Sequence, residues 1–445
     1  MRYICFYFFL VLLVSGTVTA GYSDLNFEYT RDRKIVMSYN LVSNDSSDTM
    51  PVFKLTMTAD IGGKEPYVPK TLSGDGAKGV IIGAGPKKTI WDAGKDCKSY
   101  DTDSIKIKFD VQEVSKSATY LCIDLVKFTL HFQINPPDLS DNNCKTKELW
   151  LRRIEPGTFM MGSPIEVGRY STEVQHEVTL TKAFYIGIFE VTQAQFKKIV
   201  GYNTSKFIDP TRPVERVSFR VLRGVQDGWS WPKSSLIDSN YVYRLVKHRR
   251  NYVDEDGYPD YDEWYTEKYH DTFFYALRNR AGGLLFDLPT EAQWEYACRA
   301  GTTTSLNNGF NVTALDKCSN LEKVGWYIDN AFYKKANETH PVGEKDPNTW
   351  GLYDMHGNVS ELCLDWYSTY GSEPTTDPVG AQTGSGRVLR GGSWKDKAGW
   401  CRSASRAEQY QGEDGKHNYW YDEDYLDRYD GDCGFRIVLN GQSDL

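Results

Sequence analysis

The sequence lacks the signatures of several common functional classes. Its 445 residues carry a net charge of −8, which argues against a nucleic-acid partner because a phosphate backbone favours a basic face. Beyond residue 20, no apolar run is long enough to span a bilayer. The chain also has no C-x-x-C pair, no glycine-rich phosphate loop, no nucleophile elbow and no two histidines spaced for one helix face. Zinc-ribbon proteins, phosphate-loop enzymes and serine or zinc hydrolases therefore find no support.

Residues 1–20 have the pattern of a secretory signal peptide. Arg2 gives the positive start, residues 4–14 form a short apolar core, and small residues lead up to Ala20. We therefore expect the mature chain to begin near Gly21 and to be secreted, periplasmic or held at the cell surface. Eight cysteines remain after cleavage, and this even number leaves both disulfides and buried thiols open.

Residues 21–118 predict a small all-β sandwich domain. Apolar and polar residues alternate over residues 34–41, 52–58 and 105–111, as they do in half-buried strands, and glycines separate these segments. The pattern is typical of immunoglobulin or fibronectin-III domains, which serve as spacers or adhesion modules. Residues 119–147 are predicted to link the two domains. Residues 120–126 and 128–132 could each be a strand, and Pro136, Pro137 and a polar run then break regular structure.

Residues 148–440 predict a second domain that mixes strands and helices. Thr192 is a plausible N-cap for a helix over residues 193–200, because Phe196 and Val200 fall on one face. Thr290 similarly precedes a helix that runs through Cys298.

The segment 351–366 is too irregular for one helix or strand and holds two separated carboxylates. Asp354 and Glu361 lie seven positions apart, with Gly357 between them to allow a sharp turn. Two carboxylates and exposed carbonyls suit a hard cation such as calcium. The alternative is a turn whose acids accept from backbone amides, and the residues alone favour it.

Seven short segments occur in a fixed order along the second domain. They are EPGTFMMGS (155–163), FEVTQ (189–193), LPTEAQWEYACRAG (288–301), GLYDMHGNVSELCLDW (351–366), RGGSW (390–394), CRSASR (401–406) and GFR (434–436). In this order they resemble the sulfatase-modifying-factor family, which includes the formylglycine-generating enzymes. The resemblance implies an irregular α+β fold of the C-type-lectin-like kind. It also implies a structural calcium ion held by Asp354, Glu361 and the carbonyls of Gly357 and Val359.

The chain departs from that family where its chemistry occurs. Active members carry two cysteines five positions apart after RGGSW, and the two thiolates hold copper(I) while a substrate cysteine is oxidised by oxygen. Soft thiolates suit copper(I). This chain offers Cys401 alone, because Asp396 stands five residues earlier. Ser393 matches the family's active-site serine.

We therefore favour an exported, non-catalytic member that binds a ligand through the groove of the lectin-like domain. The alternative is an oxidase that makes formylglycine in sulfatases, with Cys401 and Ser393 as candidate catalytic residues and copper as the cofactor. Iron-dependent sulfoxide synthesis, a third role in the wider family, is disfavoured because it needs a companion helical domain.

Two acidic segments rich in tyrosine interrupt the second domain. Residues 252–271 hold Asp254, Asp256, Gly257 and Glu263 at calcium-loop spacing, but Tyr252 replaces the first aspartate, which favours a solvated loop. Residues 413–432 hold Tyr419, Trp420 and Tyr421 among acids, and such aromatics suit a binding surface for a protein, peptide or glycan. The alternative is that these aromatics pin the loop to the domain.

Overall fold

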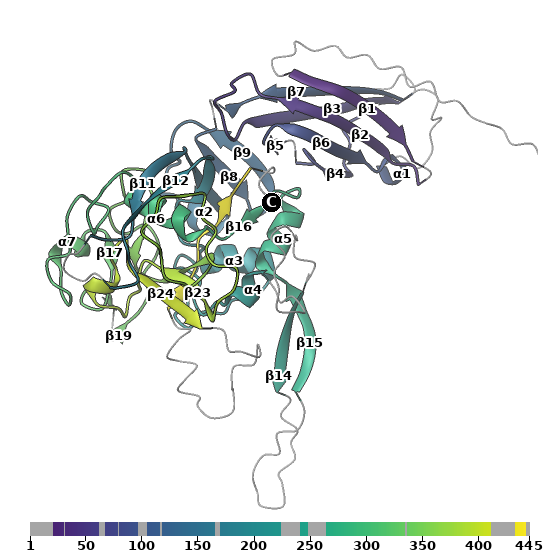
Figure 1. Cartoon of the computed structure of the whole chain (residues 1–445). Coiled ribbons are helices and arrows are strands. Elements are labelled where there is room, and N and C mark those ends of the chain that lie inside the picture. Colours follow the sequence, from purple (N-terminus) through teal and green to yellow (C-terminus); the bar gives the residue numbers. More distant parts are fainter. Residues whose placement is uncertain are drawn as a thin grey trace, which may run out of the picture.

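The computed structural model shows a chain of two packed parts and a projecting hairpin (Figure 1). It describes residues 21–30, 32–61, 67–78, 80–96, 105–115, 118–164, 170–223, 241–247, 264–333, 336–410 and 432–441. The predicted signal peptide at residues 1–20 lies outside these ranges. Within them, no helix has both the length and the apolar character that crossing a membrane requires.

The N-terminal part contains two antiparallel sheets. One has the strand order β1 (Gly21–Tyr29), β2 (Ile35–Val42), β6 (Gly85–Trp91) and β4 (Leu72–Gly74). The other has the order β5 (Val80–Ile82), β3 (Val52–Ile61) and β7 (Ile105–Glu113). A single turn of helix, α1 (Ala93–Asp96), follows β6.

One apolar cluster lies between these two sheets. Alternate residues of β2, such as Met37 and Tyr39, contribute to it together with Phe53 and Leu55 of β3. The side chains between them point to the other face, since successive residues of a strand alternate. The period-two pattern of these segments therefore corresponds to half-buried strands.

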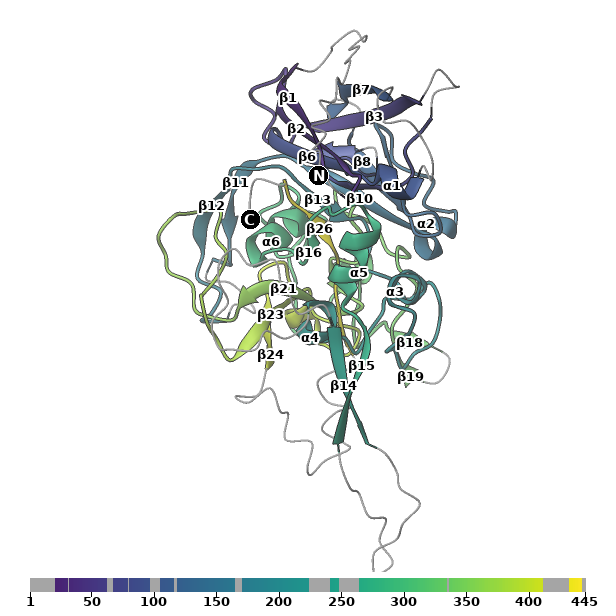
Figure 2. The same ribbon diagram turned by 90° about the vertical axis from the view of Figure 1, so that its right-hand side faces the viewer.

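A six-stranded sheet forms the centre of the second part. Its order is β16 (Phe286–Asp287), β26 (Val438–Leu439), β13 (Phe184–Gly187), β10 (Glu148–Ile154), β8 (Tyr120–Asp124) and β9 (Thr129–Gln133). Strand β26, which comes last in the chain, thus lies between the edge strand β16 and β13 (Figure 2).

The first half of the predicted linker at residues 119–147 contains two strands, at the places where the sequence allows them. Strand β8 pairs with β10 in antiparallel register from Tyr120 to Asp124, and β9 pairs with β8. These strands belong to the central sheet because Leu121 and Ile123 are buried in its core. The sequence segment between the two domains is therefore part of the second one. Only the short helix α2 (Asn143–Thr146) follows before β10 begins.

Helices cover both faces of the central sheet. Three of them pack with Leu151 and Tyr185 on one face: α3 (Gln193–Val200), α4 (Phe219–Arg223) and α5 (Phe273–Arg280). On the opposite face, Ile186 packs with Trp294 and Ala297 of α6 (Glu291–Arg299). Thr192 and Thr290 both form capping boxes, with Gln195 and Gln293, as their sequences predict. This mixture of short helices and many strands confirms the α+β class.

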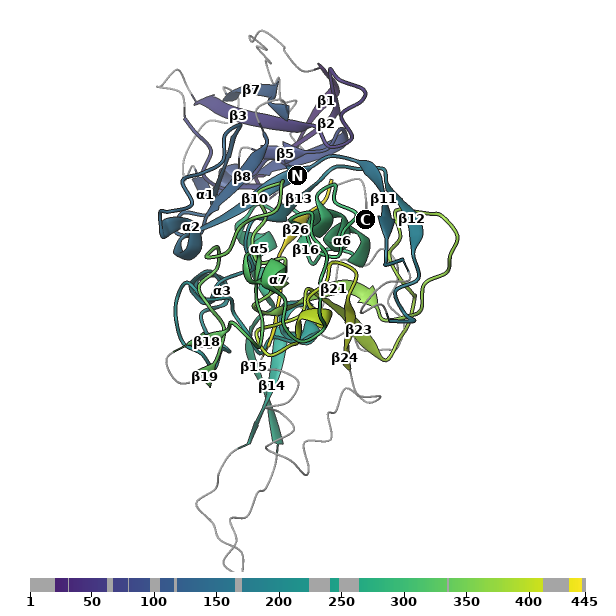
Figure 3. The same cartoon turned by 90° about the vertical axis from the view of Figure 1, so that its left-hand side faces the viewer.

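Smaller sheets and turns build the rest of the second part (Figure 3). Three strands pair as β11 (Gly157–Met161), β12 (His176–Leu180) and β22 (Thr375–Thr376). Four pair as β24 (Arg406–Tyr410), β23 (Gly386–Arg390), β21 (Ser360–Trp366) and β25 (Cys433–Gly434). Two-residue pairs join β17 (Gly325–Trp326) to β20 (His356–Gly357) and β18 (Phe332–Tyr333) to β19 (Ala336–Asn337), near α7 (Ser319–Glu322).

The projecting hairpin consists of β14 (Tyr241–Lys247) and β15 (Trp264–Asp271), which pair antiparallel (Figure 1). Asp254, Asp256, Gly257 and Glu263 lie between them, outside the described residues. Because strands flank this segment, the helix–loop–helix calcium motif does not apply.

The two parts of the chain share one apolar core. Met50, Val52, Val80 and Ile82 of the N-terminal part belong to the same buried cluster as Leu121 of β8. Polar contacts reinforce this junction. Arg153 pairs with Asp48 and donates to the carbonyl of Met50, and the hydroxyl of Tyr185 donates to the carbonyl of Ala118. The N-terminal part is therefore packed against the second part through these residues.

Candidate functional site

The predicted calcium turn contains a carboxylate that is already paired. Both oxygens of Glu361 accept from Arg436, at 2.6 Å from Nε and 2.5 Å from Nη2, and the indole of Trp294 donates to Glu361 at 2.7 Å. All three side chains are fully buried. The guanidinium thus occupies the positions from which Glu361 would bind a cation, which disfavours Glu361 as a calcium ligand.

Two further buried carboxylates lie beside this pair. Glu190 accepts from the amide nitrogen of Val359 at 3.1 Å and from the side chain of Asn358 at 2.7 Å. Asp354 accepts from the amide of Gly343 through Oδ2, whereas its buried Oδ1 has no partner within the described residues. Burial raises the pKa of Asp354 to about 6 and raises the pKa of Glu190 well above its usual range.

The turn itself has the geometry that its glycine suggests. Gly357 has φ of 82°, and a Cβ there would lie 1.9 Å from the carbonyl oxygen of Trp326. Among the described residues, no group of three or more histidine, cysteine, aspartate or glutamate side chains is arranged to hold a metal ion. Calcium at Asp354, Gly357, Val359 and Glu361 stays a prediction, and the orphaned oxygen of Asp354 is the observation that favours it.

The predicted active-site serine lies between two carboxylates. Ser393 Oγ is 2.6 Å from Oδ2 of Asp396 and 3.0 Å from Oδ2 of Asp432. A hydroxyl has one proton, so it can donate to only one of them, and the other must bring its own proton. Asp432 is ion-paired with Lys395 at 2.8 Å, whereas burial raises the pKa of Asp396.

Cys401 is fully buried beneath the glycine turn that precedes Ser393. Its Sγ lies 4.0 Å from the carbonyl oxygen of Ser393, and a Cβ on Gly392 would lie 2.8 Å from the sulfur. Burial raises the pKa of this thiol well above its usual range, and the Asp396 carboxyl adds to the effect. A thiol in this state is a poor nucleophile and a poor copper ligand.

The carbonyl of Cys401 fixes a neighbouring imidazole. It accepts from Nδ1 of His356 at 2.7 Å, and Nε2 of the same ring accepts from the amide of Asn307. Burial lowers the pKa of His356 to about 4, so the ring is neutral and both nitrogens have a structural role.

Comparison with known proteins agrees with the seven family segments found in the sequence. A family model described as the sulfatase-modifying factor enzyme 1-like domain matches residues 138–440. The chain belongs to the sulfatase-modifying-factor family. The chaperone protein LppX of Paenibacillus barcinonensis is 31% identical over 231 residues, which cover 49% of this chain and 71% of that protein. The formylglycine-generating enzyme of Mus musculus is 27% identical over 278 residues, 57% of this chain and 69% of that enzyme.

The solved structures that match this chain superimpose on it with low TM-scores. Treponema denticola variable protein 1 superimposes with a TM-score of 0.44 at 26% identity, covering 66% of this chain and 95% of that one. PvdO from Pseudomonas aeruginosa gives 0.42 at 22% identity, covering 65% and 94%. Membership of the sulfatase-modifying-factor family rests on the sequence matches.

The predicted ligand-binding residues Tyr419, Trp420 and Tyr421 lie outside the described residues. The structure does describe where that segment leaves and returns. It leaves at the end of β24 and returns at Asp432, next to Ser393, and β24 and β25 are strands of the same four-stranded sheet. The segment therefore returns beside the candidate serine.

The cysteines in the described part of the chain are free thiols. Seven of the eight are described, all seven are buried, and none forms a disulfide. Cys97 lies outside the described ranges. The sequence leaves both disulfides and buried thiols open, and in the described residues the structure has buried thiols.

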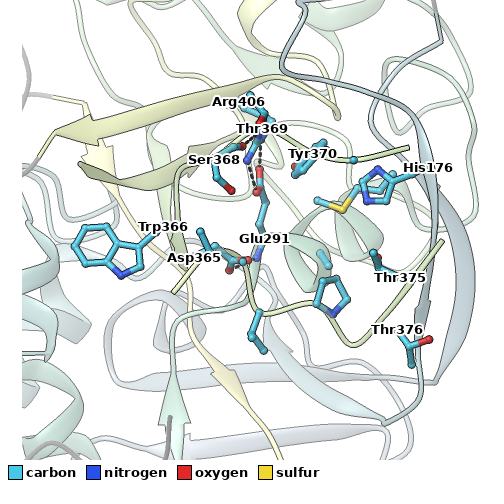
Figure 4. A pocket seen from close by; sticks show the side chains of 17 residues that line it. His176, Glu291, Asp365, Trp366, Ser368, Thr369, Tyr370, Thr375, Thr376 and Arg406 are labelled. Carbon is cyan, nitrogen blue, oxygen red and sulfur yellow. Dashed lines mark hydrogen bonds and ion pairs between the residues drawn. The ribbon is translucent and has the colours of Figure 1, made fainter. Parts of the chain in front are cut away.

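A cavity of about 540 Å³ was not predicted from the sequence. It lies between the β11–β12–β22 sheet and the start of α6, and its wall includes His176, Asp365 and Tyr370 (Figure 4). Its lining comes from several segments far apart in the chain, so no local pattern indicates it. The family's segment LPTEAQWEYACRAG supplies one signal, because its Glu291 pairs with Arg406 in the cavity floor.

Proposed function

We propose that this chain is an exported binding protein of the sulfatase-modifying-factor family and that it has no formylglycine-generating activity. The observation that carries this proposal is the state of Cys401. Its thiol is buried with a raised pKa, and the residue five positions earlier is Asp396, which is hydrogen-bonded to Ser393. One buried thiol and one carboxyl do not provide the two thiolates that copper(I) favours.

The proposed binding surface is the segment 411–431 together with the polar residues at its root. Asp396, Asp432 and Lys395 lie around Ser393 where the segment returns. The tyrosines and Trp420 of the segment provide contact area, and its acids favour a cationic or polyhydroxyl partner. We further propose a C-type-lectin-like groove for this surface and export by way of residues 1–20.

The activity is tested with a peptide that carries a sulfatase-type Cys-x-Pro-x-Arg motif. The purified protein is incubated with copper, oxygen and this peptide, and the peptide mass is followed over time. We expect no conversion of the cysteine to an aldehyde. Time-dependent conversion that is lost in Cys401→Ser would establish the oxidase alternative and overturn the proposal.

The binding surface is tested with arrays of glycans and basic peptides. Wild type is compared with a Tyr419→Ala, Trp420→Ala, Tyr421→Ala variant of equal melting temperature. We expect the variant to lose the interactions that wild type shows. If it keeps all of them, segment 411–431 is not the binding site.

A further inference from the structure

The cavity of about 540 Å³ beside α6 is distinct from the serine and its two carboxylates. Its volume falls in the range of sites for small molecules. One wall is the strand β22, whose Thr375 and Thr376 are exposed and pair in parallel with β12. The opposite wall is formed by Asp365 and the first turn of α6 (Figure 4).

The ionised groups in the cavity floor are paired with each other. Arg406 holds Glu291 through Nε at 2.6 Å and Nη2 at 2.8 Å, and its Nη1 donates to the carbonyls of Thr172 and Ser368. The guanidinium also lies 3.8 Å above the ring of Tyr370. Because its charge is balanced and its donors are occupied, Arg406 offers little to an anionic ligand.

Two nearly buried acceptors in the wall remain available. Asp365 is 4% exposed, and its Oδ2 accepts from the amide of Glu291 at 2.7 Å. Within the described part of the chain, Oδ1 of Asp365 has no protein partner. His176 is 5% exposed, and its Nδ1 must donate to the carbonyl of Val174, since a carbonyl only accepts. Nε2 of His176 is then an acceptor, again without a partner among the described residues.

Apolar and aromatic surface completes the lining. Met161 and Val379 line the cavity, and the ring of Tyr370 lies 4.9 Å from that of His176. The cavity therefore combines acceptors, threonine hydroxyls and flat apolar surface in a floor of balanced charge. A sugar ring matches this combination, because it has hydroxyl donors at its edge and C–H groups on its faces.

We propose that this cavity binds one neutral saccharide unit, with Asp365 and His176 accepting from its hydroxyls and Thr375 bonding to its edge. A cationic ligand fits less well, because arginines lie near both carboxylates of the cavity. Arg406 and Arg390 are ion-paired with Glu291, and Arg406 and Arg387 act on Asp365. This site does not require segment 411–431, so it stands apart from the surface in the proposed function.

The test uses saturation-transfer NMR and titration with the methyl glycosides of glucose, galactose, mannose and N-acetylglucosamine. Methyl glucuronide serves as the anionic comparison ligand, and glucosamine serves as the cationic one. The variants are Thr375→Val and His176→Gln, each of which keeps the side-chain size, and the control is Thr158→Val. Thr158 is on the same three-stranded sheet and bonds to Thr179 outside the cavity.

We expect at least one neutral glycoside to bind wild type and Thr158→Val equally. Binding should weaken about five- to tenfold in Thr375→Val and in His176→Gln, the range expected for loss of one hydrogen bond. The Tyr419, Trp420, Tyr421 triple variant should bind as wild type does. Absence of binding by every neutral glycoside, stronger binding of a charged arm, or unchanged binding in Thr375→Val would overturn the proposal. Because Thr375 is exposed, we expect Thr375→Val to fold, so this outcome can be read even if His176→Gln does not fold.

Discussion

The hydroxyl oxygen of Ser393 lies 2.6 Å from Oδ2 of Asp396, the residue five positions before Cys401. This contact gives Asp396 a structural role. The same oxygen lies 3.0 Å from Oδ2 of Asp432, which is ion-paired with Lys395. Asp396 is therefore held in a polar network with Ser393, Asp432 and Lys395.

Placing a cysteine at position 396 should not create a copper(I) site. We expect Asp396→Cys to bind copper(I) no more tightly than wild type, because the Cys401 thiol stays buried beneath Gly392 with a raised pKa. Competition with a copper(I) chelator measures this affinity, and Asp396→Cys with Cys401→Ser is the control. A tight site that needs both cysteines would contradict the expectation.

Asp365 predicts a loss of stability as the pH rises. Burial, assisted by the charge of Glu291, raises the folded-state pKa of Asp365 to about 7 from its ordinary value of 3.8. The folded state therefore holds the proton more tightly than the unfolded state, and the free energy of unfolding falls between about pH 4 and pH 7. Asp365→Asn keeps an acceptor for the amide of Glu291 but cannot ionise. From pH 4 to pH 8, the free energy of unfolding of Asp365→Asn should rise relative to that of wild type by at most about 4 kcal/mol, and its melting temperature should rise with it.

The control for this measurement is Asp316→Asn, which alters an exposed ion pair with Lys397. Thermal melts at pH 4, 6 and 8 are compared for the three proteins. Parallel curves for wild type and Asp365→Asn would show that this carboxyl does not carry the pH dependence.

The Glu361–Arg436 pair should be costly to break from one side. Arg436→Met leaves the carboxylate of Glu361 buried without its cation, and such a loss destabilises proteins by about 3–5 kcal/mol. Adding Glu361→Gln should recover part of this loss, since the uncompensated charge is then gone. Urea denaturation gives the three free energies, and Lys34→Met at the exposed pair with Asp32 is the matched control. Equal losses in the single and double variants would show that packing alone is responsible.

Calcium at the Asp354 turn is tested through the melting temperature. A ligand that binds only the folded state adds about 2.7 kcal/mol at a hundredfold excess over its dissociation constant. We expect calcium to raise the melting temperature of wild type and to have a much smaller effect on Asp354→Asn, because the orphaned Oδ1 is the predicted ligand. Magnesium serves as the ionic-strength control. The same rise in both proteins would remove Asp354 from the site.

The junction between the two parts depends on Arg153. We expect Arg153→Met to lower the free energy of unfolding by about 3 kcal/mol, because Asp48 is left nearly buried without its partner. Circular dichroism and tryptophan fluorescence should still report one transition at one temperature. Two separate transitions in wild type would show that the parts unfold independently.

The sequence predicts the features that depend on near neighbours. Thr192 and Thr290 cap helices because their partners lie three residues away, and the strands of the first part alternate residue by residue. The sequence allows a strand at β8, but its place in the central sheet depends on its pairing with β10, which the local pattern of residues 119–124 does not reveal.

The candidate site shows the same division. The turn at Gly357 follows from its own residues, but the cation that holds Glu361 is Arg436, 75 positions further on. His176 and Asp365 likewise meet in one cavity only because β22 pairs with β12. Spacing along the chain carries no information about either arrangement.

The apolar core that runs from Val52 into Leu121 has a mechanical consequence. A body whose two halves share buried side chains tumbles in solution as a single particle, so both halves should give the same rotational correlation time. A molecule bound to the N-terminal part would then be held at a constant distance and orientation from the cavity and from Ser393.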